Sequence, residues 1–464
     1  VRRLSAVPGF HFCREGCAVS RHTTGMSLFT KMIVAVVGGI ALGIAFQFIR
    51  LAVGDSSSEW QLINQLLLVD ITSGEGVQGI GLLNIVGTLF MKAMQLAVVP
   101  LVFASLALAV GAVDDLSKLG RIARKMLACF AFFYAVCVVA AQGVAMVVRG
   151  SGAFNVSLPE DISAGAETID AYNPFTIITD LVPNNFIAAF SDNSGVLAVI
   201  VIALFVGIGL LKMPEEAAPL KKLLESINSL LSAGISFLIS HVGPFAIFCM
   251  LARALAVYGT DYLYPALAYV LTGMATPIAL FFILYPATIW VTCRLNPIPF
   301  IRKCAKTAIL ASATNSSAAA LPVNMRTCET ELGCGKSTTS LILPTGMTIH
   351  MNGTVVMQSI ATIFVATVAG VDIQPYHLLI AGLVAVTTAI STPPVPMAGT
   401  VLVSVILGAL GFTNDACMLA YAVVLAVNYP IGMAFMPMNV IGDAACCMVV
   451  SNSEGELDRE VYRS

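Results

Sequence analysis

Eight apolar runs, each long enough to cross a lipid bilayer, are spread along this chain from residue 32 to residue 450. A helix needs about 20 apolar residues to span the hydrocarbon core of a membrane. The runs cover residues 32–52, 81–111, 126–148, 195–212, 229–257, 264–293, 338–368 and 415–450. Lipid offers no partners to the backbone, so only helices and closed barrels can cross it. The runs therefore predict an all-α polytopic membrane protein.

The composition excludes several other classes of protein. Hydrophobic residues make up 58% of the 464 positions and charged residues 11%, whereas charged residues make up about 25% of a typical soluble domain. A formal net charge of −2 argues against a nucleic-acid partner, because phosphate recognition needs clustered Lys and Arg. The chain offers no nucleophile with a positioned base, so we do not expect an enzyme.

The twelve cysteines show neither a disulfide framework nor a metal-ligand spacing. Several lie inside apolar runs, where a cysteine packs as a small hydrophobic residue. These are Cys129, Cys137, Cys249, Cys446 and Cys447.

Two further apolar regions, at residues 299–323 and 375–411, are interrupted in the middle. A polar tip divides the first region and a proline-rich tip divides the second. Each arm is too short to cross a core of about 30 Å at about 1.5 Å per residue. Both regions are therefore predicted to be re-entrant helical hairpins.

The basic residues of the short loops set the expected orientation. Lys and Arg gather before the third span, before the fifth span and before the first hairpin, whereas the alternate loops carry almost none. This pattern predicts cytoplasmic termini in a plasma (inner) membrane. Residues 1–25 are basic and lack the apolar core of a signal peptide, so they are either a tail or a stretch upstream of a start at Met26. Residues 451–464 are charged and are expected to form a solvated tail.

Two polar segments interrupt the apolar pattern where lipid would demand an unbroken helix. The first runs from Thr314 to Pro322 and the second from Pro344 to Thr354. Both combine small hydroxyl and amide residues with backbone-breaking Gly or Pro. Unpaired backbone groups in hydrocarbon cost several kcal/mol each, so we expect these breaks beside a buried polar cavity.

These two segments resemble the serine-rich hairpin tip and the Asn-Met-Asp-Gly-Thr break of dicarboxylate/amino acid:cation symporters, the family of glutamate transporters. The resemblance extends over most of the chain. Its other pieces are Pro100–Ser105 late in the second span, Val182–Phe186 before the fourth, Pro244 in the fifth, Gln358 after the break and Asn439–Asp443 in the eighth. Each piece alone is weak, but together they make a specific match.

The resemblance implies a homotrimer that works as an elevator in the lipid bilayer. It implies one transporter domain over residues 26–450, with a scaffold at about 32–111 and 174–257. The transport core would comprise about 126–148 and 264–450. This core would carry solute and cation between the two faces, around a midplane site made by discontinuous helices.

The resemblance assigns the solute's carboxylate to the tip of the first hairpin. Ser316 and Ser317 match positions that present hydroxyl and backbone groups to it, and helix N-termini favour an anion there without a basic side chain. Thr354 and Asn439 match positions that face the solute, and Val395 on the second hairpin is expected to contact it. The alternative for the two serines is that they only let two backbones approach closely.

The resemblance also implies sodium as the coupling ion, with no other cofactor. Gly346 and Thr348 match positions that give oxygen ligands to sodium, as hard cations require. Ile390 and Thr392 match a hairpin tip whose carbonyls cap a second cation.

Asn439 and Asp443 lie four residues apart, so they share one face of the eighth helix. Asp443 is the only acidic residue in the deep half of this span, and an intramembrane carboxylate is a functional candidate because an unpaired charge is costly there. We expect it to bind sodium together with Gly346, Thr348 and Asn439. The alternative is an Asp443 that only reaches the cytoplasmic interface.

Three departures from the family pattern change the expected cargo. Phe435 stands where members with acidic substrates carry an arginine, and Gly432 where an aspartate holds the substrate's amino group. Asn315 stands where some members carry an arginine. Without a guanidinium a second carboxylate lacks its bidentate partner. A solute that contacts Phe435 is thus expected to be a neutral amino acid or related organic acid.

The ion sites depart from the family pattern as well. The break reads His350-Met351-Asn352 where the family has Asn-Met-Asp, so one sodium site is expected to be missing. His350 and Asn352 remain candidates for the cation site. A histidine titrates near neutrality, so His350 either takes part in proton coupling or is a neutral ring bonded to backbone freed by the break.

The sequence thus predicts secondary active symport of a small carboxylate-bearing solute, driven by sodium. One alternative is a proton-coupled symporter that uses His350. Another is a non-transporting member that acts as a sensor or conducts anions.

Overall fold

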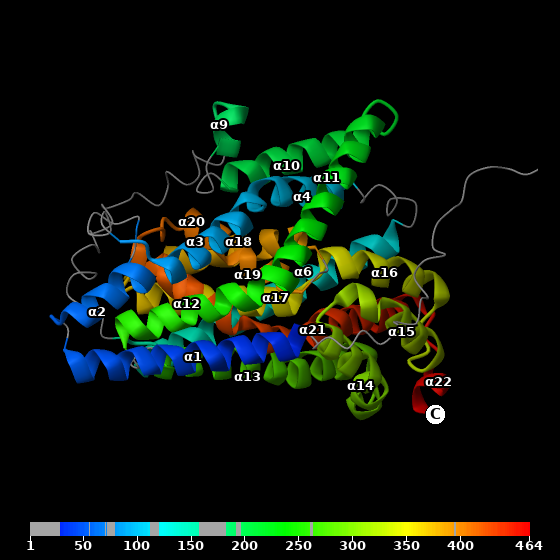
Figure 1. Cartoon of the computed structure of the whole chain (residues 1–464). Coiled ribbons are helices and arrows are strands. Elements are labelled where there is room, and N and C mark those ends of the chain that lie inside the picture. The colour runs from blue at the N-terminus through cyan, green and yellow to red at the C-terminus, as the bar shows by residue number, and fades with distance from the viewer. Residues whose placement is uncertain are drawn as a thin grey trace, which may run out of the picture.

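The regular elements of the computed structural model are all helices in the part of the chain that it describes. That part comprises residues 28–54, 56–69, 71, 79–111, 120–156, 182–191, 196–259, 263–393 and 396–464. Most of the helices run along one common direction and form the elongated bundle of Figure 1. The predicted all-α class is confirmed for these residues.

Seven helices of the described residues are long and apolar enough to cross a membrane. They are Thr30–Val53, Leu82–Gly111, Arg121–Gly150, Ala218–Val257, Leu263–Cys293, Lys336–Val368 and Ala416–Glu454. The predicted run 195–212 forms α10, Val196–Lys212, whose described apolar part is shorter than these. The chain is therefore a polytopic integral membrane protein.

The helix that holds the fifth predicted span begins earlier than its apolar run. α11, Ala218–Phe237, and α12, Gly243–Tyr258, are joined by the π-helical turn η4, Leu238–Val242. The first turns of α11 carry exposed charged residues such as Lys221, which an apolar window excludes. Pro244 follows the π turn near the start of α12, where its missing N–H breaks no helical hydrogen bond.

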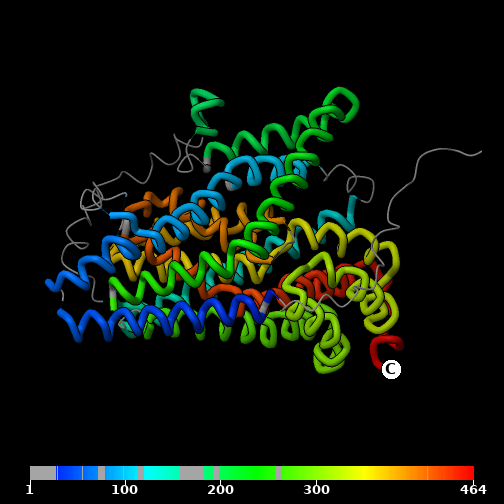
Figure 2. The backbone as a smooth tube through the Cα atoms, viewed as in Figure 1, coloured from blue at the N-terminus to red at the C-terminus, as the bar shows by residue number. Residues whose placement is uncertain are grey.

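α17, Asn352–Val368, lies at the centre of the bundle (Figures 1 and 2). Almost every one of its residues is buried. It packs against α6, Arg121–Gly150, α13, Leu263–Thr288, and α21, Asp415–Glu454. A helix that is buried on all sides belongs to the protein core, so the residues at its N-terminus are kept away from lipid.

A second group of helices packs mainly within itself. α1, Leu28–Val53, lies along α12, and α3, Leu82–Leu96, also contacts α12. α4, Val98–Gly111, packs against both α10 and α11, which lie along the top of the bundle in Figure 1. The remaining short elements outside the two interrupted regions are α2, Ser58–Ile63, η1, Asn64–Leu68, α9, Phe186–Ser191, η6, Ile289–Cys293, and α22, Arg459–Arg463.

The first interrupted region folds back on itself. α14, Pro297–Thr314, ends at Asn315, whose backbone is left-handed with φ 49°. α15, Ser317–Thr330, starts directly after Ser316 and packs against α14. Asparagine tolerates the left-handed region better than most residues, which explains the reversal at this position.

The second interrupted region also folds back, but its second arm is broken. α18, Pro375–Ser391, packs against α20, Val403–Ala409, and the short α19, Ala398–Val401, precedes α20. Val395 at the tip of this region lies outside the described residues.

The seventh predicted span is interrupted, as the sequence predicted. α16, Lys336–Ile349, ends at His350, and α17 begins after Met351. These two residues have φ/ψ of −130°/79° and −111°/67°, outside the helical region. Pro344 lies within α16 and does not end it, so the break falls on the polar residues rather than on the proline.

The prediction of a solvated tail holds for most of residues 451–464, which are exposed, but fails at two buried positions. α21 continues to Glu454 with Ser451 fully buried, and Tyr462 on α22 is only 1% exposed. The Tyr462 hydroxyl donates a hydrogen bond to the Asn296 carbonyl at 2.7 Å and accepts one from the Phe300 N–H at 3.1 Å. The charged residues stay at the surface while this aromatic ring docks beside α14, a contact that composition does not reveal.

Candidate functional site

The break between α16 and α17 is held by two side chains from neighbouring helices. The Tyr134 hydroxyl, on α6, donates a hydrogen bond to the Ile349 carbonyl at 2.9 Å and accepts one from the Met351 N–H at 2.8 Å. The Asn439 side-chain oxygen, on α21, accepts the Gly353 N–H at 2.8 Å. Backbone groups that leave a helix must find other partners when buried. The break is therefore a built feature of the fold.

His350, at the break, pairs with Asp443 on α21. Its Nδ1 lies 2.7 Å from Asp443 Oδ1, and the two side chains are 0% and 4% exposed. The imidazole stacks on Phe130, with ring centroids 3.9 Å apart and planes 11° apart. Its buried Nε2 has no hydrogen-bond partner among the described residues. The arrangement fixes a titratable ring against a carboxylate and leaves one nitrogen available to a ligand.

Gly346 makes the room that this carboxylate needs. A Cβ at this position would lie 2.2 Å from Asp443 Oδ1, well inside van der Waals contact. The Gly346 carbonyl accepts the His350 N–H at 2.8 Å. The structure thus brings together three of the predicted cation-site residues, Gly346, His350 and Asp443.

Thr348 faces different surroundings. Its hydroxyl donates to the Thr345 carbonyl at 2.7 Å, and its side chain is exposed. With Ile390 and Thr392 it lines a cavity of about 310 Å³, whose other lining residues come mainly from α4 and α11. Among the described residues, the Thr348 hydroxyl and the Asp443 carboxylate thus bond different partners.

Two predicted solute residues contact the sulfur of Met436, and a third contacts one of those two. The Ser317 hydroxyl donates to this sulfur at 3.3 Å, and the Asn439 amide group donates to it at 3.6 Å. The same amide group lies 3.3 Å from the Thr354 hydroxyl. Sequence reasoning missed Met436, because an apolar side chain in a span gives no sign that it will carry hydrogen bonds.

Ser316 serves the helix that it precedes. Its side-chain oxygen accepts the Ala319 N–H at 3.4 Å and so caps the N-terminus of α15. Capping by serine stabilises a helix start, and it places the positive end of this helix at the hairpin tip.

The departures from the family pattern at Asn315 and Gly432 are linked, because these two residues pack against each other. Asn315 is 1% exposed, and neither polar atom of its side chain has a hydrogen-bond partner within the described part of the chain. A Cβ at position 432 would lie 2.6 Å from Asn315 Nδ2, so the Asn315 side chain fills the space in which an aspartate would stand. An unsatisfied buried amide costs about 1–3 kcal/mol, which makes Asn315 a candidate contact for a bound ligand.

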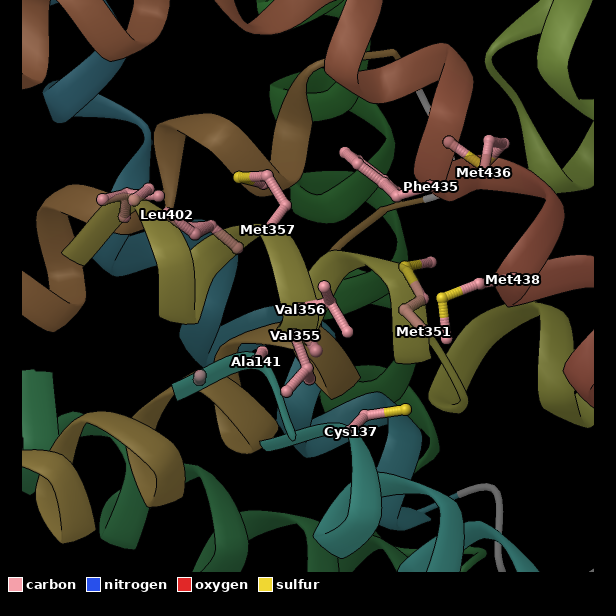
Figure 3. Packing of buried hydrophobic residues seen from close by; sticks show 14 of the residues in the cluster. Cys137, Ala141, Met351, Val355, Val356, Met357, Leu402, Phe435, Met436 and Met438 are labelled. Atoms are coloured by element: carbon pink, nitrogen blue, oxygen red, sulfur yellow. The ribbon is translucent and has the colours of Figure 1, made fainter. Parts of the chain in front are cut away.

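Phe435 gives the site an apolar wall. Its side chain is buried, and its carbonyl approaches Gly353 so closely that a Cβ there would lie 2.2 Å away. Figure 3 labels Phe435 and Met438 on α21, which packs against α17, together with Met351 at the break and Val356 on α17.

Asn352 adds a second unsatisfied amide. Its Nδ2 donates to the Tyr285 hydroxyl at 3.1 Å, while its buried Oδ1 has no partner among the residues that the structure describes. The Tyr285 hydroxyl in turn donates to the Met438 carbonyl at 2.7 Å. Tyr134 and Tyr285 were both missed from the sequence, although a tyrosine inside an apolar span needs a polar partner for its hydroxyl.

Gln358 ties the second interrupted region to the centre of the bundle. Its Nε2 donates to the Gly399 carbonyl at 2.9 Å, and its Oε1 accepts the Thr388 hydroxyl at 3.0 Å. The Thr392 hydroxyl donates within α18 to the Thr388 carbonyl at 2.7 Å. Both arms of this region are therefore anchored on one side chain of α17.

Comparison with protein families gives one match that covers nearly the whole described chain. The sequence model of the sodium:dicarboxylate symporter family matches residues 28–453. These residues include every helix described above except α22.

Three curated proteins illustrate the relationship. The proton/glutamate-aspartate symporter of Escherichia coli (strain K12) is 26% identical over 442 residues, which are 94% of each chain. The proton/sodium-glutamate symport protein of Bacillus caldotenax is 25% identical over 81% of this chain and 88% of its own. The C4-dicarboxylate transport protein of Xanthomonas campestris pv. campestris (strain B100) is 27% identical over 81% of this chain and 83% of its own. All three align with most of the bundle.

Proposed function

Because the chain belongs to the sodium:dicarboxylate symporter family, we propose that it carries a small solute with one carboxylate across the membrane together with a proton. The family is made of transporters and not enzymes. The observation that carries the proposal is that α21 presents two polar groups side by side. Asn439 bonds the Thr354 hydroxyl directly and shares the Met436 sulfur with Ser317, and Asp443, one turn later, pairs with His350.

The solute's carboxylate would bind between the hairpin tip and the break. The N-terminus of α15 at Ser316 and Ser317 favours an anion, and Thr354 and Asn439 supply hydrogen-bond donors. The buried amide of Asn315 is unsatisfied and would bond a polar group of the solute. The relatives are named for glutamate, aspartate and C4-dicarboxylates, but Phe435 offers no charge to a second carboxylate.

The His350–Asp443 pair would carry the proton. Protonation of His350 turns a pair with net charge −1 into a neutral ion pair, which is less costly inside a membrane protein. A solute anion bound nearby favours this protonated state, and by reciprocity the proton favours the anion. One of the relatives is named as a proton symporter and another for both proton and sodium.

Sodium remains a second candidate for the coupling ion, because Gly346 and Asp443 present oxygen atoms beside His350. Asn352 Oδ1 is buried and unpartnered, and hard cations bind such oxygens. Sodium bound at Asp443 Oδ1 would compete with the imidazole that lies 2.7 Å from this oxygen. This competition makes the proton our first choice.

The proposed transport cycle is elevator-like. Residues 32–111 and 174–257 would form the scaffold of a homotrimer, and residues 126–148 and 264–450 the moving core with eight spans in all and two re-entrant hairpins. The described contacts support this division, because α1, α3, α4, α10, α11 and α12 pack mainly with one another and α17 packs with α6, α13 and α21. The cavity between α4, α11 and Thr392 would then lie at the sliding interface.

The proposed setting is the plasma (inner) membrane, with both termini in the cytoplasm. The Lys and Arg of alternate short loops support this orientation. The N-terminal stretch and the loop that holds Lys118 lie outside the described residues.

A thermal-shift screen of the purified protein tests the solute class. A ligand that binds the native state raises the unfolding temperature. We expect shifts with small monocarboxylates and neutral amino acids, weaker ones with glutamate and C4-dicarboxylates, and larger shifts at acidic than at alkaline pH. Thr354→Val, which removes a hydroxyl at constant volume, should abolish them. If no carboxylate shifts the unfolding temperature at any pH, with or without sodium, the proposal fails and a non-transporting role gains support.

A further inference from the structure

Three cysteines from separate parts of the chain meet at one point in the described structure. Cys328 lies near the end of α15, Cys334 lies in the turn before α16, and Cys447 lies on α21. Their Sγ atoms all lie within 4.8 Å of one another, and all three side chains are buried. None of these thiols contributes to the proposed transport site.

We propose that these three thiols bind a single thiophilic metal ion of the zinc type. Zinc binds thiolates at about 2.3 Å, so the sulfurs of a tetrahedral site lie about 3.8 Å apart. Sulfurs already within 4.8 Å reach that spacing through small side-chain rotations. Thiolates select soft or borderline ions over sodium and magnesium, so this site is chemically distinct from one that binds the coupling ion.

The surroundings of the cluster favour thiolates. Cys334 directly precedes Gly335, the N-cap of α16, and the positive end of a helix stabilises a nearby thiolate. The backbone of this turn is ordered, because the Cys334 N–H donates to the Cys328 carbonyl at 2.8 Å. Two of the three ligands are therefore held together before any metal binds.

Hydroxyl groups complete the cluster and can supply a fourth donor. Ser451 lies one helical turn after Cys447 on the same face of α21, is fully buried, and accepts the Gly335 N–H at 3.3 Å. The Thr339 hydroxyl lies 3.5 Å from the Cys447 sulfur. Three sulfurs and one oxygen would give four donors, which is the coordination number of zinc in structural sites.

The end of the chain covers this cluster. The Asp458 N–H donates to the Gly333 carbonyl at 2.8 Å, and a Cβ on Gly335 would lie 2.2 Å from the Glu456 carboxylate. A bound ion would link α15, the start of α16 and α21 under this cover. The site would thus fasten the first interrupted region to the last long helix.

Simple packing is the competing explanation, because buried cysteines often act as small hydrophobic residues. Cys417 provides a matched control, since it lies on α21 and is fully buried like Cys447 but belongs to no such cluster in the described residues. If the cysteines only pack, the Cys417→Ser and Cys447→Ser variants should bind metal with the same affinity.

Titration of the reduced, full-length protein in detergent with Cd²⁺ tests the proposal. Cd²⁺ stands in for zinc because its thiolate complexes absorb in the ultraviolet. We expect one Cd²⁺ per chain with a thiolate charge-transfer band in the wild type and in Cys417→Ser. In Cys328→Ser and Cys447→Ser the affinity should fall more than about tenfold, since even the loss of an outer-shell partner costs that much. No band in the wild type, or equal binding by Cys447→Ser, would overturn the site.

A second measurement avoids variants that fail to fold. X-ray absorption of the zinc-loaded wild-type protein should show three sulfur neighbours at about 2.3 Å. A shell of only nitrogen and oxygen would contradict the proposal. A disulfide among the three cysteines of the native protein would also contradict it, if the protein still took up no metal after that disulfide was reduced. Neither result depends on whether the chain transports a carboxylate.

Discussion

At the scale of single residues, the contact between His350 and Asp443 is the feature on which the proposed proton coupling depends. The sequence identified both as candidates, because an acidic residue and a titratable ring inside apolar spans are costly without a role. Their contact could not be predicted, because it joins positions 93 residues apart and depends on the room left by Gly346. Met436 and Tyr134 could not be predicted either, since their roles arise from where the helices cross.

Replacing His350 by asparagine tests the proton hypothesis at residue level. The amide keeps a hydrogen-bond donor near Asp443 but cannot take up a proton near neutral pH. We expect solute binding to lose its preference for acidic pH, as seen in thermal shifts measured across pH, while some binding remains. Phe130→Leu is the matched control, because it removes the stacking ring and leaves the proton acceptor. An unchanged pH profile in His350→Asn would exclude His350 as the proton carrier.

Gly432→Asp tests the coupling between positions 315 and 432. The new side chain would collide with Asn315, because even a Cβ would lie 2.6 Å from its Nδ2. Overpacking of this kind costs about 1–3 kcal/mol, so the single variant should unfold at a lower temperature. The double variant Asn315→Ser with Gly432→Asp should recover stability and strengthen the binding of α-amino acids. Additive losses in the double variant would show that the two positions are independent.

At the scale of elements, the long apolar helices were predicted well and their ends poorly. Continuous apolar runs identify spans because lipid removes every alternative to a helix. α11 begins eleven residues before its predicted run. Its first turns carry exposed charged residues, so a search for apolar runs does not include them. The tail at residues 451–464 was predicted to be solvated, but one tyrosine and a few backbone contacts dock it. Such docking depends on the surface of α14, which local composition cannot report.

Tyr134→Phe tests whether the break depends on α6. The substitution removes a hydroxyl that bonds both the Ile349 carbonyl and the Met351 N–H. A buried backbone group without a partner costs about 1–3 kcal/mol, so we expect a clear loss of thermal stability and of solute binding. Tyr421→Phe is a suitable control, because its hydroxyl bonds the Val401 carbonyl at 2.9 Å away from the break. Equal effects on solute binding would mean that Tyr134 is only structural.

At the scale of the whole molecule, α21 connects the features described above. It carries Phe435, Asn439 and Asp443 at the candidate site, Cys447 at the thiol cluster and Ser451 beneath the docked tail. Its length was predicted from the sequence, and so was the shared face of Asn439 and Asp443. The thiol cluster was missed, because the spacing of Cys328, Cys334 and Cys447 along the chain fits no metal motif. Only the packing of α15 and α16 against α21 brings them together.

Uptake into proteoliposomes under an imposed pH gradient, without sodium and with the membrane potential clamped at zero, tests the central claim most directly. The carboxylate solute identified by thermal shift is supplied in the external buffer, which is made more acidic than the vesicle interior. The internal concentration of the solute is then measured at steady state. Coupling to one proton predicts accumulation of about tenfold per pH unit, because one pH unit corresponds to about 1.36 kcal/mol. His350→Asn should equilibrate the solute or fail to move it. Uptake that ignores the pH gradient and requires sodium would contradict the account.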